Sequence, residues 1–313
     1  MLSFILKRIA IAIPTLFVIA LLTFFAVQAI PGDVATIILG ENASQEQIDA
    51  LREELGLNLP LIQQFFNWIG GVVSGDLGKS LIYNQDVAQA LFQRSVITLT
   101  ISFVGVIVCS IIGVGLGMLG AIKGGRTDSA LLSTTSVGLA IPNFWAAVIL
   151  VYIFSVTLAW LPANGWTQFS DDPWRWFLGL ILPVTALVIV PIATVSRQTR
   201  ASFKSVLGKD FIRSLRAAGI SSNRIIYKHA LRNAAIPIVT IIGIQFVLLV
   251  GGAVVIEQVF ALPGIGQLAI QAVTTRDIPI IQGVVLFVAA MVLITNLLLD
   301  LLYAWLNPKV RLA

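Results

Sequence analysis

The side chains with the greatest capacity for chemistry lie in residues 197–235, the basic segment, which holds nine of the chain's twenty Lys and Arg residues and the only histidine, His229. Cationic side chains bind carboxylates and phosphates, and an imidazole can serve as a general base or a metal ligand. Catalysis and metal binding both need several groups in one constellation, and His229 has no second ligand. We therefore expect a structural or docking role for His229, no catalytic residue and no metal site.

Nucleotide chemistry is not encoded in this chain. The stretch GDLGKS, Gly75 to Ser80, lacks the G-x-x-x-x-G-K-[ST] spacing of a phosphate-binding loop, and no Walker sequence occurs elsewhere. The single cysteine, Cys109, excludes an intrachain disulfide. Any use of ATP therefore requires a partner protein.

The elements that position these side chains follow from composition. The 313 residues are 58% hydrophobic and 11% charged, whereas a soluble domain carries about 25% charged residues. This composition predicts an all-α integral membrane protein. A helix needs roughly 20 apolar residues to cross the hydrocarbon core, and six charge-free stretches qualify. We predict the first crossing within residues 1–30 and the others at residues 96–122, 129–160, 176–196, 236–256 and 278–306.

The distribution of charge predicts the orientation of these crossings. Fifteen of the twenty Lys and Arg residues fall in one set of loops, and twelve of the fifteen acidic residues fall in the other. Cytoplasmic loops carry the excess of Lys and Arg. Both termini are therefore expected in the cytoplasm, which agrees with an even number of crossings.

Three regions follow from the predicted crossings. Residues 1–30 form the N-terminal tail and first crossing, residues 31–95 form an extracytoplasmic segment with short helices, and residues 96–313 form a five-helix core. The extracytoplasmic segment is expected to pack as a cap over the helix bundle, and a docking surface or gate on the outer side is the functional alternative considered with it.

The outer loops carry local signals of their own. Ser44 and Gln47 form a capping box at the start of an amphipathic helix. A shorter outer loop starts at Glu257 and includes Arg276 and Asp277. We expect these last two side chains to be exposed and to form at most a weak surface pair.

Inside the crossings, small residues and prolines are more prominent than polar groups. Gly113 and Gly117 have the GxxxG spacing of closely approaching helices, and Pro142, Pro183 and Pro191 can kink the third and fourth crossings. We favour packing over direct substrate contact for these residues. The crossings show no buried charge pair, whereas ion-coupled transporters usually carry ionisable groups inside the membrane.

The pattern of the basic segment predicts a helix, a glycine turn and a second helix. Leu207, Phe211 and Leu215 recur every four residues and are expected on one helical stripe. Gly219 follows, and Ser221 is a good N-cap for the second helix. The segment could anchor the chain to anionic lipid, bind nucleic acid, or dock a cytoplasmic partner. The apolar stripes and the glycine corner favour docking, and no aromatic platform supports nucleic acid.

A series of motifs extends along essentially the whole chain. In order, they include IPGD, LGLNLPLIQQF, GDLGKS, SVITLTIS, IPNFWAAVIL, SRQTRASFKSVLGKDFIRSLRAAGI, HALRNAAIP, EQVFALPGIG, TTRDIPIIQG and NLLLDLLYAWLNPKVR. In this order they resemble the dipeptide, oligopeptide and nickel permease family of bacterial ABC importers.

The resemblance implies a permease with the type I ABC importer fold in the bacterial cytoplasmic (inner) membrane. The implied partners are a second, related permease, two cytoplasmic ATP-binding subunits that hold ATP and Mg, and an extracytoplasmic solute-binding protein. Membrane lipid surrounds the chain, no nucleic acid is involved, and no cofactor is expected in the chain itself. The solute stays open among peptides, glutathione and nickel chelates, because the binding protein does most of the selecting.

The basic segment matches the coupling region of that family, whose short helix sits in a groove of the ATPase. Carried over by position, the coupling residues are Asp210, Phe211, Ile212, Arg213, Ser214, Leu215, Arg216, Ala217, Ala218 and Gly219. The Glu-Ala-Ala that names this loop in other importers is replaced here by Arg213, Ser214 and Leu215.

The leading hypothesis is thus the permease half of an ATP-driven importer that works by alternating access and has no ATPase site of its own. A self-sufficient secondary transporter is the main alternative. The docking segment and the lack of carboxylates inside the crossings count against it. A membrane enzyme would need a nucleophile with a base inside the bilayer, and no histidine lies in any predicted crossing.

Overall fold

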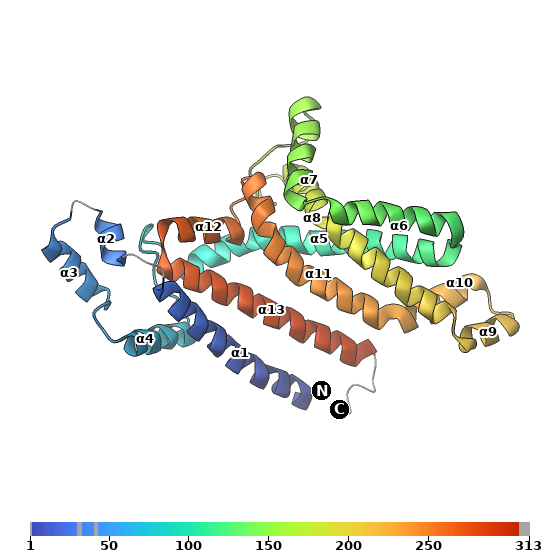
Figure 1. Cartoon of the computed structure of the whole chain (residues 1–313), viewed down its shortest axis with the longest axis horizontal. Helices are drawn as coiled ribbons and strands as arrows, with labels where there is room; N and C mark the ends of the chain where they lie inside the picture. Colours follow the sequence, from blue (N-terminus) through green and yellow to red (C-terminus); the bar gives the residue numbers. More distant parts are fainter. Residues whose placement is uncertain (1, 30–32, 41–42, 307–313) are drawn as a thin grey trace. The chain divides into compact units, whose positions relative to one another are not determined.

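The computed structural model describes residues 2–29, 33–40 and 43–306, and this part of the chain is helical apart from loops and one isolated β-bridge between Lys79 and Asp86 (Figure 1). It forms two compact units. The first unit comprises Met1–Ile97 and Gly264–Ile294, and the second comprises Thr98–Pro263 and Thr295–Ala313. This division differs from the predicted single core of residues 96–313, because Gly264–Ile294 packs with the N-terminal part of the chain.

The first unit is built around the start of α5. Its elements are α1 (Leu2–Gln28), α2 (Val34–Leu39), α3 (Gln45–Glu54), α4 (Leu61–Ser74), the first part of α5 (Val87–Lys123), α12 (Ile265–Thr275) and the first part of α13 (Ile278–Leu306). Side chains of α5, α12 and α13 form its core, namely Val87, Ala90, Leu91, Ile265, Leu268, Ala272, Ile280 and Val284. Burial of these apolar groups holds three segments together that lie far apart in the sequence.

Aromatic side chains join α1 to α4 in the first unit. The ring of Phe24 lies 5.4 Å from that of Phe65 in an edge-to-face arrangement and 5.9 Å from that of Trp68 in a stacked one, measured between centroids. Such pairs add to the stability that comes from burial alone. The two helices are therefore held at a defined contact.

Polar caps begin the short helices of the first unit. The predicted capping box of α3 is confirmed, because Ser44 and Gln47 each accept a hydrogen bond from the other's backbone N–H. Asp33 caps α2 and accepts hydrogen bonds from the Thr36 hydroxyl at 2.7 Å and the Arg52 guanidinium at 3.2 Å. The Thr36 hydroxyl, and after it Arg52, hold the pKa of the Asp33 carboxyl below its ordinary value.

The second unit is a bundle centred on one long helix, α8. Its elements are the rest of α5, α6 (Gly125–Ala140), α7 (Asn143–Leu150), the π-helix η1 (Val151–Thr157), α8 (Pro173–Leu207), α9 (Asp210–Ala217), α10 (Ser222–Arg224), the π-helix η2 (Ile225–Ala230), α11 (Leu231–Val259) and the end of α13. Helix α8 packs against α6, α7 and α11 (Figure 1). It continues through Pro183 and Pro191 without a break.

Five helices of the described chain are long and apolar enough to cross a membrane, namely Leu6–Gln28, Val87–Lys123, Pro173–Leu207, Ser222–Val259 and Ile278–Tyr303. A sixth crossing results if α6 and the α7–η1 helix count as one span. The all-helical membrane fold predicted from the sequence is thus confirmed. Three of these helices, Val87–Lys123, Pro173–Leu207 and Ser222–Val259, extend beyond the predicted crossings, because helical structure continues past the apolar run at their ends.

The third predicted crossing, residues 129–160, is not one straight helix. Helix α6 ends at Ala140, α7 starts at Asn143, and the two are bent by 93° at the break. Ile141 and Pro142 adopt extended backbone conformations there. Proline lacks a backbone N–H and disfavours helical conformation in the residue before it, so the bend falls at Pro142.

Two acidic residues assigned to an outer loop are buried. Asp277, expected to be exposed, is 1% exposed and accepts hydrogen bonds from the Ser80 hydroxyl and the Leu81 backbone N–H, all within the first unit. Glu257, expected to start the loop, lies inside α11 in the second unit with no exposed surface, and Thr98 donates a hydrogen bond to it at 2.5 Å. The chain therefore does carry a carboxyl group within a helix long enough to span the membrane, contrary to the sequence-based expectation.

Candidate functional site

The predicted coupling residues form a short helix with a turn, displayed at the end of α8. Gly208 ends α8, Lys209 occupies the N-cap of α9, and α9 runs from Asp210 to Ala217. Helix α9 packs against η2, which continues into α11. The site is therefore attached to two of the long helices of the second unit, α8 through the chain and α11 through packing.

Burial divides the coupling residues into an anchor and a free surface. Ile212 has no exposed surface and fixes α9 to the bundle. Leu215 is half-buried. The other members are exposed, namely Asp210, Phe211, Arg213, Ser214, Arg216, Ala217, Ala218 and Gly219. We call these eight residues the α9 surface.

The expected stripe of Leu207, Phe211 and Leu215 does not exist as one helical face, and that prediction is wrong. Helix α8 ends at Gly208, so Leu207 belongs to α8 and Phe211 belongs to α9. Leu207 packs into the core of the second unit, whereas Phe211 is 36% exposed. A glycine followed two residues later by an aspartate is a helix stop and start signal, and it identifies the break in the sequence.

The turn after α9 has the geometry of a Schellman-type cap. The backbone N–H of Ile220 donates to the carbonyl of Leu215 at 3.1 Å, and that of Gly219 donates to Arg216 at 3.0 Å. Gly219 has φ of +76°, a left-handed conformation that favours glycine. The predicted glycine turn is therefore present at Gly219.

The second helix of the basic segment also starts where predicted. Ser221 is the N-cap of α10, although its side chain makes no capping hydrogen bond in the described structure. Helices α10, η2 and α11 form one continuous span from Ser222 to Val259. His229 lies in η2, where its backbone carbonyl accepts a hydrogen bond from Asn233 at 2.8 Å.

An apolar cluster joins the end of α8 to η2 and the start of α11. It consists of Phe203, Val206, Ala230, Ala234 and Ile238, all buried, from α8, η2 and α11. Phe203 and Ala230 have no exposed surface at all. Because close-packed interiors transmit displacement, the end of α8 and the start of α11 are expected to move together.

A charged cluster that the sequence did not reveal connects α6 to α8. Asp128, in the first turn of α6, accepts hydrogen bonds from Arg200 Nη2 and Lys204 Nζ, each at 2.6 Å, and it also contacts Arg200 Nε. The side chain of Asp128 is 10% exposed. Asp128 is one of only three acidic residues among fifteen cations on the predicted cytoplasmic side, and that scarcity was the available signal for this cluster.

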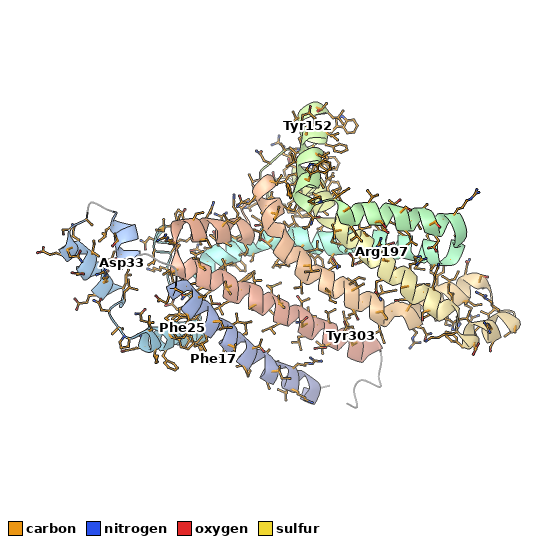
Figure 2. All side chains as sticks on the ribbon, in the orientation of Figure 1. Phe17, Phe25, Asp33, Tyr152, Arg197 and Tyr303 are labelled. Carbon is orange, nitrogen blue, oxygen red and sulfur yellow. The ribbon has the colours of Figure 1, made fainter. Side chains whose placement is uncertain are left out.

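Further polar contacts extend this connection along α8. Arg197, labelled in Figure 2, donates from Nη2 to the Ser136 hydroxyl at 2.5 Å, and from Nε to Thr135 at 3.4 Å. Both acceptors belong to α6. Arg197, Arg200 and Lys204, three cations of the basic segment, thus bind α8 to α6. All three precede the α9 surface in the sequence.

Glycines of α5 allow close approach to the same part of α8. A Cβ atom on Gly113 would lie 2.8 Å from Val195 Cβ, and one on Gly117 would lie 2.5 Å from the backbone oxygen of Ser196. Both distances are too short for real atoms. The predicted packing role of this GxxxG pair is therefore confirmed.

We expect Asp128→Asn to lower the melting temperature of the full-length chain in detergent by about 5 °C, because Arg200 and Lys204 lose their partly buried carboxylate partner. The measurement is a thermal unfolding curve. Asp210→Asn is the matched control, because its pair with Arg213 is exposed on both sides and should leave the melting temperature unchanged. Equal melting temperatures for the two variants would contradict the assignment.

Comparison with known proteins identifies relatives over the full length. Residues 110–312 match the family described as "Binding-protein-dependent transport system inner membrane component", and residues 1–102 match the N-terminal membrane component of such systems. A protein described as a peptide transport system permease of Brucella abortus (strain 2308) is 38% identical over 312 residues, 99% of each chain. The glutathione transport system permease protein GsiC of Escherichia coli (strain K12) has the same identity and coverage.

A solved structure shares the fold. A chain of the inward-facing MetNI methionine ABC transporter matches with a TM-score of 0.55, covering 70% of this chain and 97% of that one. The sequence identity is 18%, so this likeness concerns the fold alone.

Proposed function

The chain belongs to the family of inner membrane components of binding-protein-dependent transport systems, and on that premise we propose that the α9 surface docks on a cytoplasmic ATP-binding subunit. The chain is a permease subunit of an ABC importer and a multi-pass protein of the bacterial cytoplasmic (inner) membrane. The observation that carries the proposal is the contrast between the fully buried Ile212 and the exposed Phe211 on one short helix. A helix that is anchored on one side and exposes an aromatic residue on the other suits helix-in-groove recognition.

Coupling would proceed through the helices attached to α9. Closure of the ATP-binding subunits displaces α9, and the packing of α9 on η2 passes this displacement to α11. The cluster of Asp128, Arg200 and Lys204 makes α6 follow α8. Rigid displacement of packed helices is an established way to switch between two access states.

The importer is proposed to contain further subunits. These are a second, related permease, two ATP-binding subunits that hold ATP and Mg, and an extracytoplasmic solute-binding protein. Hydrolysis of ATP is assigned to the ATP-binding subunits, and this chain contributes no ATPase site. The residues Asp210–Gly219 are its proposed contribution to coupling.

The proposed solute is a small peptide, with glutathione included in that class. Relatives at 38% identity are named for peptide transport and for glutathione transport, and they match along 99% of the chain. Glutathione is itself a short peptide, so one solute class accounts for both names.

The proposed function is tested by reconstitution in proteoliposomes with the partner permease, the ATP-binding subunits and the solute-binding protein. We expect uptake of labelled dipeptide or glutathione only when ATP is enclosed with the ATP-binding subunits. Deleting Phe211 to Gly219 should abolish that uptake, because the docking helix is lost. Uptake driven by an ion gradient without ATP-binding subunits would contradict the proposal. Buried Glu257 would then be the first candidate for the ion-coupling group.

A further inference from the structure

A cavity in the first unit has not been used by the function proposed so far. It has a volume of about 400 Å³ and lies among the end of α1, the loop before α4, α4 itself, the GDLGKS turn and the start of α13. This volume is in the range of cavities that hold small molecules or headgroups. Its walls combine apolar and polar side chains from five separate segments.

The polar lining has a net positive charge. Lys79 is the charged member, the amides are Gln28, Asn67, Gln64 and Gln282, and no acidic side chain of the described residues lines the cavity. No ion pair involves Lys79 in the described part of the chain. An oxyanion is the ligand that this combination of an ammonium group and amide N–H donors would bind.

Gln282 is the buried member of this polar lining. The residue is only 4% exposed, and it is one of those that line the cavity. The Gln64 amide donates to the carbonyls of Leu57 at 3.1 Å and Leu59 at 2.8 Å. An oxygen acceptor bound in the cavity would give the Gln282 amide N–H groups a hydrogen-bond partner.

The position of the cavity along the membrane normal favours a lipid over a transported solute. Helix α1 contributes Phe24 and Gln28, at the end of its apolar span, and α13 contributes Ile278 and Gln282, at the start of its own. The cavity is therefore at the level of the lipid headgroups, whereas solute sites of transporters lie near the membrane midplane. Trp68, which stacks on Phe24, is also of the type enriched at this level of a membrane protein.

We propose that this cavity binds the phosphate-bearing headgroup of a phospholipid on the extracytoplasmic side. Lys79 pairs with the phosphate, and Gln282 donates a hydrogen bond to a headgroup oxygen. Phe24 and Trp68 contact the glycerol and the first part of the acyl chains. The bound lipid joins α1, α4 and α13 at one point of the first unit.

The test uses the full-length chain in detergent, titrated with palmitoyl-oleoyl phosphatidylglycerol and examined by native mass spectrometry. We expect the tightest lipid to bind about fivefold more weakly to Lys79→Gln, the loss typical of one basic residue at a lipid surface. Gln282→Leu, which keeps the size of the side chain and removes its donor, should also weaken binding. Arg175→Gln is the control, because Arg175 is exposed on the same predicted face and lies outside this cavity.

The outcomes separate a built site from general attraction. A loss in Lys79→Gln and Gln282→Leu with binding to Arg175→Gln unchanged supports the proposal. An equal loss in all three variants shows non-specific attraction of lipid to positive charge and overturns it, as does unchanged binding in Lys79→Gln. Displacement of the lipid by alanyl-alanine would also overturn it, because the cavity would then be a solute site.

Discussion

Replacing Phe211 with aspartate is expected to lower ATP-driven uptake by the reconstituted importer about tenfold or more. A single aromatic residue commonly dominates the binding free energy of an interface, and a carboxylate would have to be desolvated in the same groove. Because Phe211 is 36% exposed, its replacement should leave the amount of folded chain in the membrane unchanged. The measurements are initial uptake rates and the amount of ATP-binding subunit that co-purifies with the chain.

Tyr227→Asp is the matched control for Phe211→Asp. Tyr227 is also an exposed aromatic residue of the basic segment, at 64% exposure, but it lies outside Asp210–Gly219. We expect its variant to retain uptake within about twofold, since exposed positions away from an interface contribute little. If both variants transport equally well, the α9 surface is not the docking site. If both lose uptake equally, charge in the basic segment matters more than the position of the aromatic group.

Gly117→Ala is expected to destabilise the folded chain by about 1–3 kcal/mol, the usual cost of overpacking. The added Cβ would lie 2.5 Å from the Ser196 backbone oxygen and 2.6 Å from Thr199 Cβ. A backbone oxygen cannot turn aside as a side chain can, so α5 and α8 must separate. Unfolding of the full-length chain in detergent by heat or denaturant measures the effect.

Gly115 provides the control within the same helix. A Cβ on Gly115 meets no described atom within 4 Å. Gly115→Ala should therefore leave the free energy of unfolding unchanged or raise it slightly, because alanine has the higher helix propensity. Equal destabilisation by the two variants would mean that helix packing at Gly117 is not the cause.

Much of the fold was accessible from local sequence. The long apolar runs predicted the membrane helices because hydrocarbon requires each backbone polar group to be paired within its own helix. The capping box at Ser44, the glycine turn at Gly219 and the break at Pro142 follow from the conformations of a few adjacent residues. The order of motifs along the chain predicted the family that the comparisons support.

The errors have a common physical origin. Periodicity placed Leu207 and Phe211 on one stripe, because a repeat of four residues does not show that one helix ends and another begins between them. Asp277 and Glu257 were assigned to a loop because charge normally marks exposed residues. Their actual burial depends on Ser80 and Thr98, each more than 150 positions away in the sequence.

The sequence by itself determined the class of protein, its helical membrane fold and the location of the basic segment, because hydropathy, turn chemistry and charge are local properties. Only the tertiary structure decided which residues of that segment are available. It buries Ile212 and exposes Phe211, directs Arg200 and Lys204 to Asp128, and places Gln282 at the wall of a cavity. These outcomes depend on contacts between helices far apart in the chain, where the free energy of packing and of pairing buried polar groups selects one arrangement.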